Sequence, residues 1–282
     1  MDLAVRHGLT IVNADSRQIY RRFDIGTAKP TADDRARVPH RGVDVADPAE
    51  PWSAARWAAD ASQWIGEIGA DRALVVGGTG LYLKALTSPF FDAPELDPDR
   101  RAALAAELAE LSVPALRQWV QRLDPARAHL GRTQLLRAAE VALLTGERLS
   151  DLHRRDARPA EFRARWLVID PGAMLQARLG ARIDSMLAGG WVDEARTIAQ
   201  DVPFGAPAWQ ACGYGVVREV ALGTAELAAA RAAILVETRQ YAKRQRTWFR
   251  HQLAGADVTR LDPRAANAAA ATDAWWLSED VK

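Results

Sequence analysis

The side chains with the most chemical promise follow a short apolar run near the start of the chain. Residues 10–14, TIVNA, are mostly β-branched or apolar and fit a buried strand. Ligand sites in open α/β sheets lie at the carboxyl ends of strands, so Asp15 and Ser16 stand where chemistry is usually done. The sequence allows two interpretations of Asp15: a catalytic carboxylate, or a cap that accepts hydrogen bonds from the backbone N–H groups that follow it.

A turn with a lysine follows this strand. Gly26 and Pro30 break regular structure after Phe23. Such a turn can place Lys29 near an anion, although a solvated lysine is the commoner outcome.

A second strand, residues 73–76 (ALVV), runs directly into Gly77-Gly78-Thr79-Gly80 and then into a helical pattern over residues 81–86. Glycines at such a junction let the backbone approach a ligand, and a helix N-terminus favours negative charge. The same glycines also suit a tight turn for purely steric reasons, so both interpretations stay open.

Helices separate the expected strands. Residues 53–68 fit a helix with one apolar stripe, formed by Trp57, Ala61, Trp64 and Ile68. Residues 165–169 (RWLVI) are a third strand, and residues 175–188 a further helix. Alternation of this kind predicts a parallel sheet. Between the second and third expected strands, helices that start near Asp97, Val113 and Arg132 form what looks like an inserted subdomain.

The clearest charge pattern lies in a helical stretch over residues 231–250. One face carries the basic stripe Arg239, Lys243, Arg246 and Arg250, and another carries Ile234, Tyr241 and Trp248, which we expect in the core. Glu237 is the only acid in this stretch, so little internal pairing explains the basic residues. The stripe therefore favours phosphate or RNA binding over a merely solvated face.

Composition sets broad bounds. The 282 residues are 49% hydrophobic and 26% charged with a net charge of +1, which predicts a folded, soluble chain and no overall charge preference. Cys212 is the single cysteine, so an internal disulfide and a cysteine-based zinc site are excluded and a reducing cytoplasm is favoured. No apolar run approaches the roughly 20 residues of a membrane span.

Seven segments in this order resemble the tRNA dimethylallyltransferases, also called isopentenyl transferases. They are ADSRQIYRRFDIGTAKP, VGGTGLYLKAL, the Asp97-Pro98 region ending in Arg101, LLRAAEVALLTG, residues 186–190, CGY and TRQYAKRQRTW. The resemblance implies transfer of a dimethylallyl group from dimethylallyl diphosphate to N6 of adenosine 37, in tRNAs that read codons beginning with U. It also implies Mg²⁺ as a cofactor and a monomeric, cytoplasmic enzyme that meets the tRNA anticodon stem-loop and no membrane.

The resemblance assigns roles to particular residues. Asp15 is the general base for the adenine amine, with Ser16, Arg17 and Gln18 beside the flipped-out adenosine. Thr79 and Arg101 touch the tRNA. The remaining tRNA-binding positions are Thr133, Gln134, Leu135, Leu136 and Arg137 in the insertion, and Arg239, Lys243 and Arg244 in the basic helix.

The chain departs from the family pattern in three places. Gln134 stands where the family usually has the first of two arginines, which leaves Arg137 and the displaced Arg132. Gly215 aligns with an arginine thought to steady the diphosphate, and Arg218, one turn further on, is the weak substitute. No Gly-x-x-x-x-Gly-Lys motif occurs, although family members carry this P-loop for the diphosphate and Mg²⁺.

The resemblance implies an α/β fold: a nucleotide-binding, P-loop-NTPase-like parallel sheet core with a helical insertion and a helical C-terminus. We expect the core at residues 1–95, without its first strand and P-loop, and at residues 161–282. The tRNA-binding insertion is expected at residues 96–160. Two other functions stay open: a non-catalytic tRNA-binding or interaction protein derived from the family, and a different phosphoryl-transfer enzyme such as a small-molecule kinase.

Overall fold

A computed structural model describes residues 1–91, 94, 96–253 and 257–278. The chain forms two units. Unit 1 comprises Met1–Leu86 and Phe162–Lys282, and unit 2 comprises Thr87–Glu161. The predicted insertion, residues 96–160, falls inside unit 2.

Unit 1 contains a three-stranded parallel sheet in the order β2-β1-β3. The central strand β1 (Thr10–Asn13) lies between β2 (His40–Arg41) and β3 (Ala73–Val76), with Val12 opposite Val75. Every residue of β1 is buried, which accounts for its mainly apolar and β-branched sequence. The first two strands expected from the sequence are therefore confirmed.

Four helices accompany this sheet along the chain. They are α1 (Asp2–His7), α2 (Ala32–Arg37), α3 (Ala54–Ile68) and α4 (Gly80–Thr87). The apolar face of α3 differs from the predicted stripe. Ala54, Trp57, Ala61 and Ile65 are buried, whereas Trp64 and Ile68 are only half-buried. Trp57 and Ala61 belong to both sets, but the buried face is rotated toward Ala54 and Ile65 relative to the predicted stripe.

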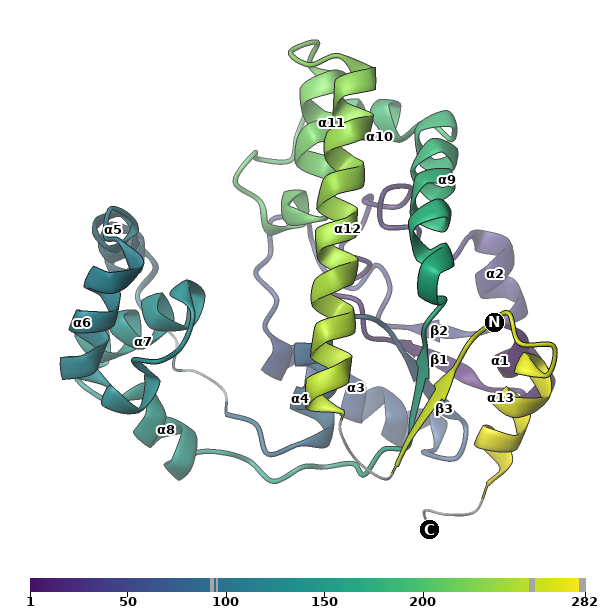
Figure 1. The fold of residues 1–282 in the computed structure, drawn as a ribbon, viewed down its shortest axis with the longest axis horizontal. Coiled ribbons are helices and arrows are strands. Elements are labelled where there is room, and N and C mark those ends of the chain that lie inside the picture. Colours follow the sequence, from purple (N-terminus) through teal and green to yellow (C-terminus); the bar gives the residue numbers. More distant parts are fainter. Residues whose placement is uncertain (92–93, 95, 254–256, 279–282) are drawn as a thin grey trace. The chain divides into compact units, whose positions relative to one another are not determined.

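The second part of unit 1 contains a separate parallel pair, β4 (Trp166–Ile169) and β5 (Val258–Leu261). Its helices are η2 (Gly172–Met174), α9 (Leu175–Ala188), α10 (Trp191–Ile198), η3 (Pro207–Gln210), α11 (Tyr214–Ala221), α12 (Leu227–Gln252) and α13 (Ala268–Leu277). The long helix α12, drawn in yellow-green, runs beside α9 and α11 (Figure 1). The predicted third strand, the helix at residues 175–188 and the long basic helix are confirmed.

β3 and β4 are two of the edge strands of unit 1. Within the described residues, β3 pairs with β1 alone and β4 with β5 alone. Both strands are wholly apolar, a composition typical of strands covered on both faces in a parallel sheet. Their last residues are nevertheless exposed, Val76 by 45% and Ile169 by 51%.

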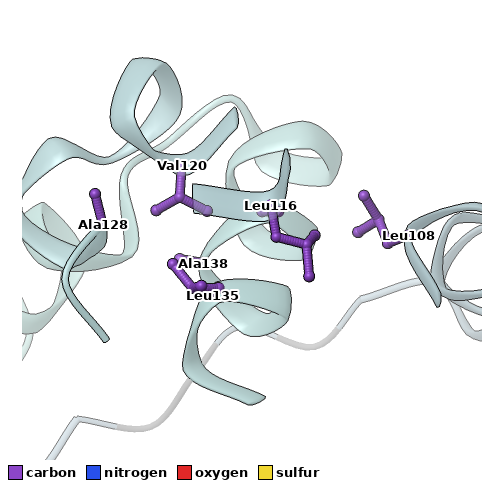
Figure 2. Packing of buried hydrophobic residues seen from close by; sticks show 7 residues of the cluster. Leu108, Leu116, Val120, Ala128, Leu135 and Ala138 are labelled. Carbon is purple, nitrogen blue, oxygen red and sulfur yellow. The ribbon is translucent and has the colours of Figure 1, made fainter. Parts of the chain in front are cut away.

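In the described part of unit 2, the regular structure is helical apart from the isolated bridge Phe90–Arg158. It contains α5 (Pro98–Ala109), α6 (Val113–Leu123), η1 (Pro125–Arg127), α7 (Arg132–Thr145) and α8 (Leu149–Arg155). The side chains of Asp97 and Ser112 cap α5 and α6, so the predicted helix starts are confirmed. Leu116, Val120 and Leu135 are fully buried in its core (Figure 2).

Candidate active site

Asp15 lies two residues beyond the end of β1 and is held by the turn that follows it. Its Oδ1 accepts hydrogen bonds from Arg17 N at 2.8 Å and Gln18 N at 3.4 Å. The capping interpretation therefore holds for Oδ1. Among the residues that the structure describes, none donates a hydrogen bond to Oδ2, so the bonds that cap the backbone also orient a carboxylate oxygen that can accept one from a ligand.

Thr79 joins the β3–α4 turn to this carboxylate turn. Its Oγ1 accepts a hydrogen bond from Ser16 N at 3.0 Å and donates one to Ser16 Oγ at 3.3 Å. Its backbone N–H donates to Ala14 O at 3.2 Å. The structure thus brings together Asp15, Ser16 and Thr79, three residues that lie in two distant sequence segments.

Glycine is required where these two turns meet. A Cβ on Gly77 would lie 2.2 Å from Ala14 O, a backbone atom at the end of β1. The steric interpretation of the glycine turn is therefore confirmed for Gly77. The close approach that it permits is also what sets Thr79 beside Ser16.

One face of α12 covers the glycine turn. Gln245 Nε2 donates to Gly78 O at 3.0 Å, and Trp248 packs so closely that a Cβ on Gly80 would lie 2.3 Å from its ring. The Tyr241 hydroxyl lies close enough to the Thr79 and Gln245 side chains for both to influence its pKa. Burial, with a further contribution from the charge of Asp15, raises the pKa of Tyr241 above its usual value.

The prediction that Tyr241 and Trp248 belong to the core is therefore wrong, because both are half-buried and face the glycine turn. Ile234 is buried as expected. Sequence reasoning also missed Gln245. The signal was present, since Tyr241, Gln245 and Trp248 follow one another at i, i+4 and i+7 on one helix face.

Arg17 and Gln18 direct their side chains to the protein. Arg17 Nη1 donates to Pro207 O at 3.1 Å. Gln18 Nε2 donates to Thr27 O at 3.0 Å and Ala28 O at 3.1 Å. Both side chains therefore fix the loop around Asp15, and their contact with adenosine stays a prediction.

This loop has a second anchor in α10 and α11. Glu194 Oε2 accepts from Asp24 N at 3.0 Å and Ile25 N at 2.8 Å, while its Oε1 accepts from the Tyr214 hydroxyl at 2.5 Å. Tyr214 Oη also accepts from Gly26 N at 3.1 Å. Burial first, and then the Glu194 carboxylate, raise the pKa of Tyr214.

Lys29 is buried, so the expectation of a solvated lysine is wrong. Its Nζ lies 2.5 Å from Asp24 Oδ1 and 2.6 Å from Asp44 Oδ1, and it also donates to Tyr20 O. The anions near Lys29 are thus side chains of the protein itself. The ammonium group ties the loop to the segment after β2.

The basic residues in the C-terminal half of α12 are exposed. Arg239, Lys243 and Arg244 all lie at the surface, and Arg244 stacks 5.8 Å from the centre of the Tyr241 ring. A cavity of about 420 Å³ is lined by Arg239, Lys243, Arg246 and Arg250 together with residues at the start of α9. The grouped cations suit a phosphate-bearing ligand.

The basic stripe is less free than its sequence suggested. Arg246 Nη2 lies 3.0 Å from Asp170 Oδ2, a carboxylate just after β4. A hydrogen bond from Gly172 N and the pairing with Arg246 hold the pKa of Asp170 below its usual value. The count of acids within residues 231–250 missed this partner because Asp170 is distant in sequence.

Arg218 is helical, as its predicted role requires, but its guanidinium is engaged. It stacks 4.4 Å from the Phe204 ring centre and 4.9 Å from that of Trp209, and Nη1 donates to Phe204 O at 3.3 Å. A diphosphate role for Arg218 stays a prediction. A Cβ on Gly215 would meet nothing within 4 Å, so position 215 has room for a side chain.

The candidate residues of unit 2 divide into surface and core. Arg101 and Arg137 reach the surface and share the carboxylate of Glu140, and Thr133 and Gln134 are exposed. Leu135 is fully buried, so the expectation that it touches tRNA is wrong for its side chain.

Two more residues of this segment support the unit from within. Leu136 packs against the same core. The displaced Arg132 donates to Leu111 O at 2.6 Å and Ala109 O at 2.7 Å, so it fastens the end of α5.

Neither a membrane span nor a metal cage is visible in the part of the chain that the structure describes. No helix there is long and apolar enough to cross a bilayer. No group of three histidine, cysteine, aspartate or glutamate side chains there could hold a metal ion.

The fold and this site define an α/β protein with a P-loop-NTPase-like parallel core, which confirms the predicted fold class. The sequence model of the IPP transferase family matches residues 18–252. The chain therefore belongs to the IPP transferase family, whose members are prenyltransferases.

Individual relatives agree with this assignment. The chain is 40% identical over 262 residues to a tRNA dimethylallyltransferase of Burkholderia vietnamiensis, covering 88% of this chain and 81% of the relative. It is 42% identical over 263 residues to that of Bordetella petrii, covering 89% and 84%.

Solved structures show the same likeness. A full-length tRNA isopentenylpyrophosphate transferase from Bacillus halodurans is 31% identical, with a TM-score of 0.62 and coverage of 92% of this chain and 83% of that one. A eukaryotic dimethylallyltransferase described as acting on tRNA has a TM-score of 0.76 at 23% identity, covering 96% and 72%, and shows the fold alone.

Proposed function

We propose that this protein transfers a dimethylallyl group from dimethylallyl diphosphate to N6 of the adenosine beside the anticodon, in tRNAs that read codons beginning with U. The observation that carries the proposal is Asp15, a carboxylate fixed at the end of a buried parallel strand with Ser16 and Thr79 beside it. Its supports are the family membership and the names of the relatives.

The reaction needs a residue that accepts a proton, because the adenine amine itself is the nucleophile. As the adenine amine attacks the allylic carbon, a C–N bond forms, the C–O bond to the diphosphate breaks, and the amine must lose a proton. Asp15 Oδ2 is the acceptor that we assign to this proton, because Oδ1 is occupied by Arg17 N and Gln18 N. A base flipped out of the anticodon loop can reach a carboxylate at a strand end.

The basic face of α12 is the surface that we assign to the tRNA backbone in unit 1. Arg239, Lys243 and Arg244 are exposed, and a cavity borders the same helix. Cations of this kind bind phosphates without reading sequence. In unit 2 we assign the same role to Arg101, Thr133, Gln134 and Arg137.

The donor diphosphate needs contacts that the described site lacks. We propose that a further parallel strand with a phosphate-binding loop completes the core, since β3 and β4 are apolar strands with open edges. Mg²⁺ usually binds through phosphate and water oxygens plus one or two carboxylates. We therefore propose that it enters with the diphosphate, whose negative charge it neutralises.

Two further properties belong to this proposal. A tRNA-modifying role and a single cysteine fit the cytoplasm, and we propose that the protein acts there as a monomer. Light scattering of the pure protein, alone and with tRNA, measures the second of these.

A side-by-side assay tests the proposed function. The printed chain and a chain extended by the in-frame codons upstream of Met1 are incubated with tRNA, labelled dimethylallyl diphosphate and Mg²⁺. Label in tRNA that depends on Asp15 supports the proposal. The outcome that overturns it is tRNA binding by both chains without any label transfer, which supports the alternative of a non-catalytic tRNA-binding protein.

A further inference from the structure

Glu140 is a carboxylate in unit 2 that serves two arginines at once. Its Oε2 accepts from Arg101 Nε at 3.2 Å and from Arg137 Nη1 at 3.4 Å. Arg101 comes from α5, whereas Arg137 and Glu140 lie one turn apart on α7. A single oxygen therefore gathers cations from two helices.

The three side chains differ in how far they reach the surface. The Glu140 side chain is 10% exposed, whereas those of Arg101 and Arg137 are 51% and 29% exposed. The carboxylate is therefore the buried partner, and the two guanidinium groups lie closer to the surface. Each arginine has five N–H donors, so a bond to one oxygen leaves most of them for another acceptor.

This cluster also presents positive charge at the surface. Two cations share one anion, which leaves a net charge of +1 with the positive groups at the surface and the negative group below them. A phosphate is the ligand for which such an arrangement is suited, because guanidinium groups bind it through paired hydrogen bonds.

We propose that Glu140 is a positioning residue that holds Arg101 and Arg137 together as one phosphate-binding site for tRNA, an inference that rests on the proposed function. Glu140 itself touches no substrate. Without its carboxylate, two like charges lose their common partner and repel, so each guanidinium turns away separately and the site loses its geometry.

A second buried acid of unit 2 is the matched control. Asp124 is fully buried, and its carboxylate accepts from Ser150 N at 2.9 Å and Ser150 Oγ at 2.7 Å. It ties the end of α6 to α8. Asp124→Asn therefore removes one buried negative charge from the same unit and leaves the arginine pair intact.

The sign of the effect separates positioning from simple charge. Glu140→Gln removes a negative charge near a polyanion, so electrostatics alone predicts tighter tRNA binding. Positioning predicts weaker binding. Glu140→Asp keeps the charge but shortens the side chain, so positioning again predicts weaker binding while electrostatics predicts no change.

The experiment titrates the full chain with an anticodon stem-loop RNA over a series of salt concentrations. We expect Glu140→Gln and Glu140→Asp to weaken binding about threefold to tenfold. We also expect them to reduce the slope of log K against log salt toward that of the double variant Arg101→Ala/Arg137→Ala. Asp124→Asn should lower Tm without weakening binding.

Two results overturn the inference. In the first, both Glu140 variants bind at least as tightly as the unaltered protein while the double arginine variant binds weakly. In the second, the double variant also binds normally, so the arginines form no RNA site. Neither result touches the proposed function, because label transfer that depends on Asp15 is measured separately.

Discussion

The end of β1 in unit 1 and the arginine pair of unit 2 position their functional groups by opposite means. Asp15 and Thr79 are set by backbone: a buried strand, a glycine turn that approaches within contact distance of Ala14, and N–H groups that hold the carboxylate. Arg101 and Arg137 are set by side chains alone, through one carboxylate on a helix. Proton transfer needs the rigid arrangement, whereas phosphate binding tolerates the looser one.

The largest effect should come from Asp15→Asn. The asparagine oxygen still accepts from Arg17 N and Gln18 N, so the turn survives while the base is lost. We expect single-turnover dimethylallyl transfer to fall about 10²- to 10⁴-fold, with the Kd for tRNA nearly unchanged. Asp33→Asn, an exposed acid on α2, is the control and should leave both quantities unaltered. A loss of tRNA affinity equal to the loss of rate would show that Asp15 serves tRNA binding and not proton transfer alone.

Leu135→Ala should give the next largest effect. Leu135 is fully buried in the core of unit 2, so truncation leaves a cavity and lowers the free energy of unfolding of that unit by about 2–5 kcal/mol. Denaturant unfolding measures this change. Leu143→Ala on the same helix removes a side chain that is 38% exposed and should cost far less. Equal costs for the two variants would show that α7 is not held by this core.

Gly77→Ala tests the backbone side of the comparison. The added Cβ meets Ala14 O at 2.2 Å, so the end of β1 must shift, at a cost of about 1–3 kcal/mol. Turnover should fall together with Tm. Gly66→Ala lies in α3 with nothing within 4 Å of the new Cβ, and it should instead stabilise the helix by about 0.5–1 kcal/mol. Unaltered turnover in Gly77→Ala would mean that the contact of Thr79 with Ser16 is dispensable.

Lys243→Gln tests phosphate binding by an exposed side chain, here on the basic face of α12. Removing one phosphate contact should reduce the slope of log K against log salt for tRNA by about 0.7–0.9, while turnover at saturating tRNA stays constant. Arg231→Gln is a fitting control on the same helix, because Arg231 is occupied by Asp184 at 2.5 Å and 2.8 Å. The assignment of the basic face fails if both substitutions change the slope equally.

The smallest effect concerns pH. Burial opposes ionisation of Asp44, but hydrogen bonds from Lys29 and Arg35 outweigh it and lower its pKa. A carboxyl whose pKa is lowered in the folded state adds stability above its unfolded pKa, about 3.9. That stability is lost as pH falls through the folded value. Asp44→Asn should therefore flatten the decline of Tm below about pH 4, as measured by thermal melts.

The sequence predicted local elements well because their signals are local. The apolar run before Asp15, the helix starts near Asp97 and Val113 and the long helical stretch over residues 231–250 each depend on neighbours within a few residues. Resemblance to the family then supplied roles for Asp15 and Thr79, and the structure shows these two segments in contact.

What the sequence missed depends on contacts between distant segments. Tyr241 and Gln245 become site residues only because α12 lies against the glycine turn, and Lys29 is buried only because Asp44 follows another strand. Leu135 shows the reverse case. The resemblance assigned all of residues 133–137 to tRNA binding, although the periodicity of the helix directs the Leu135 side chain into the core.

Glu194 has a consequence for interpreting natural variants of this protein. It lies in α10, far along the chain from Asp15, and touches no residue that we assign to substrate. Its carboxylate nevertheless holds two backbone amides of the loop that follows the catalytic turn. An inherited change at position 194 would therefore produce the phenotype of an active-site mutation, undermodified tRNA, in a protein whose proposed catalytic residues are all intact.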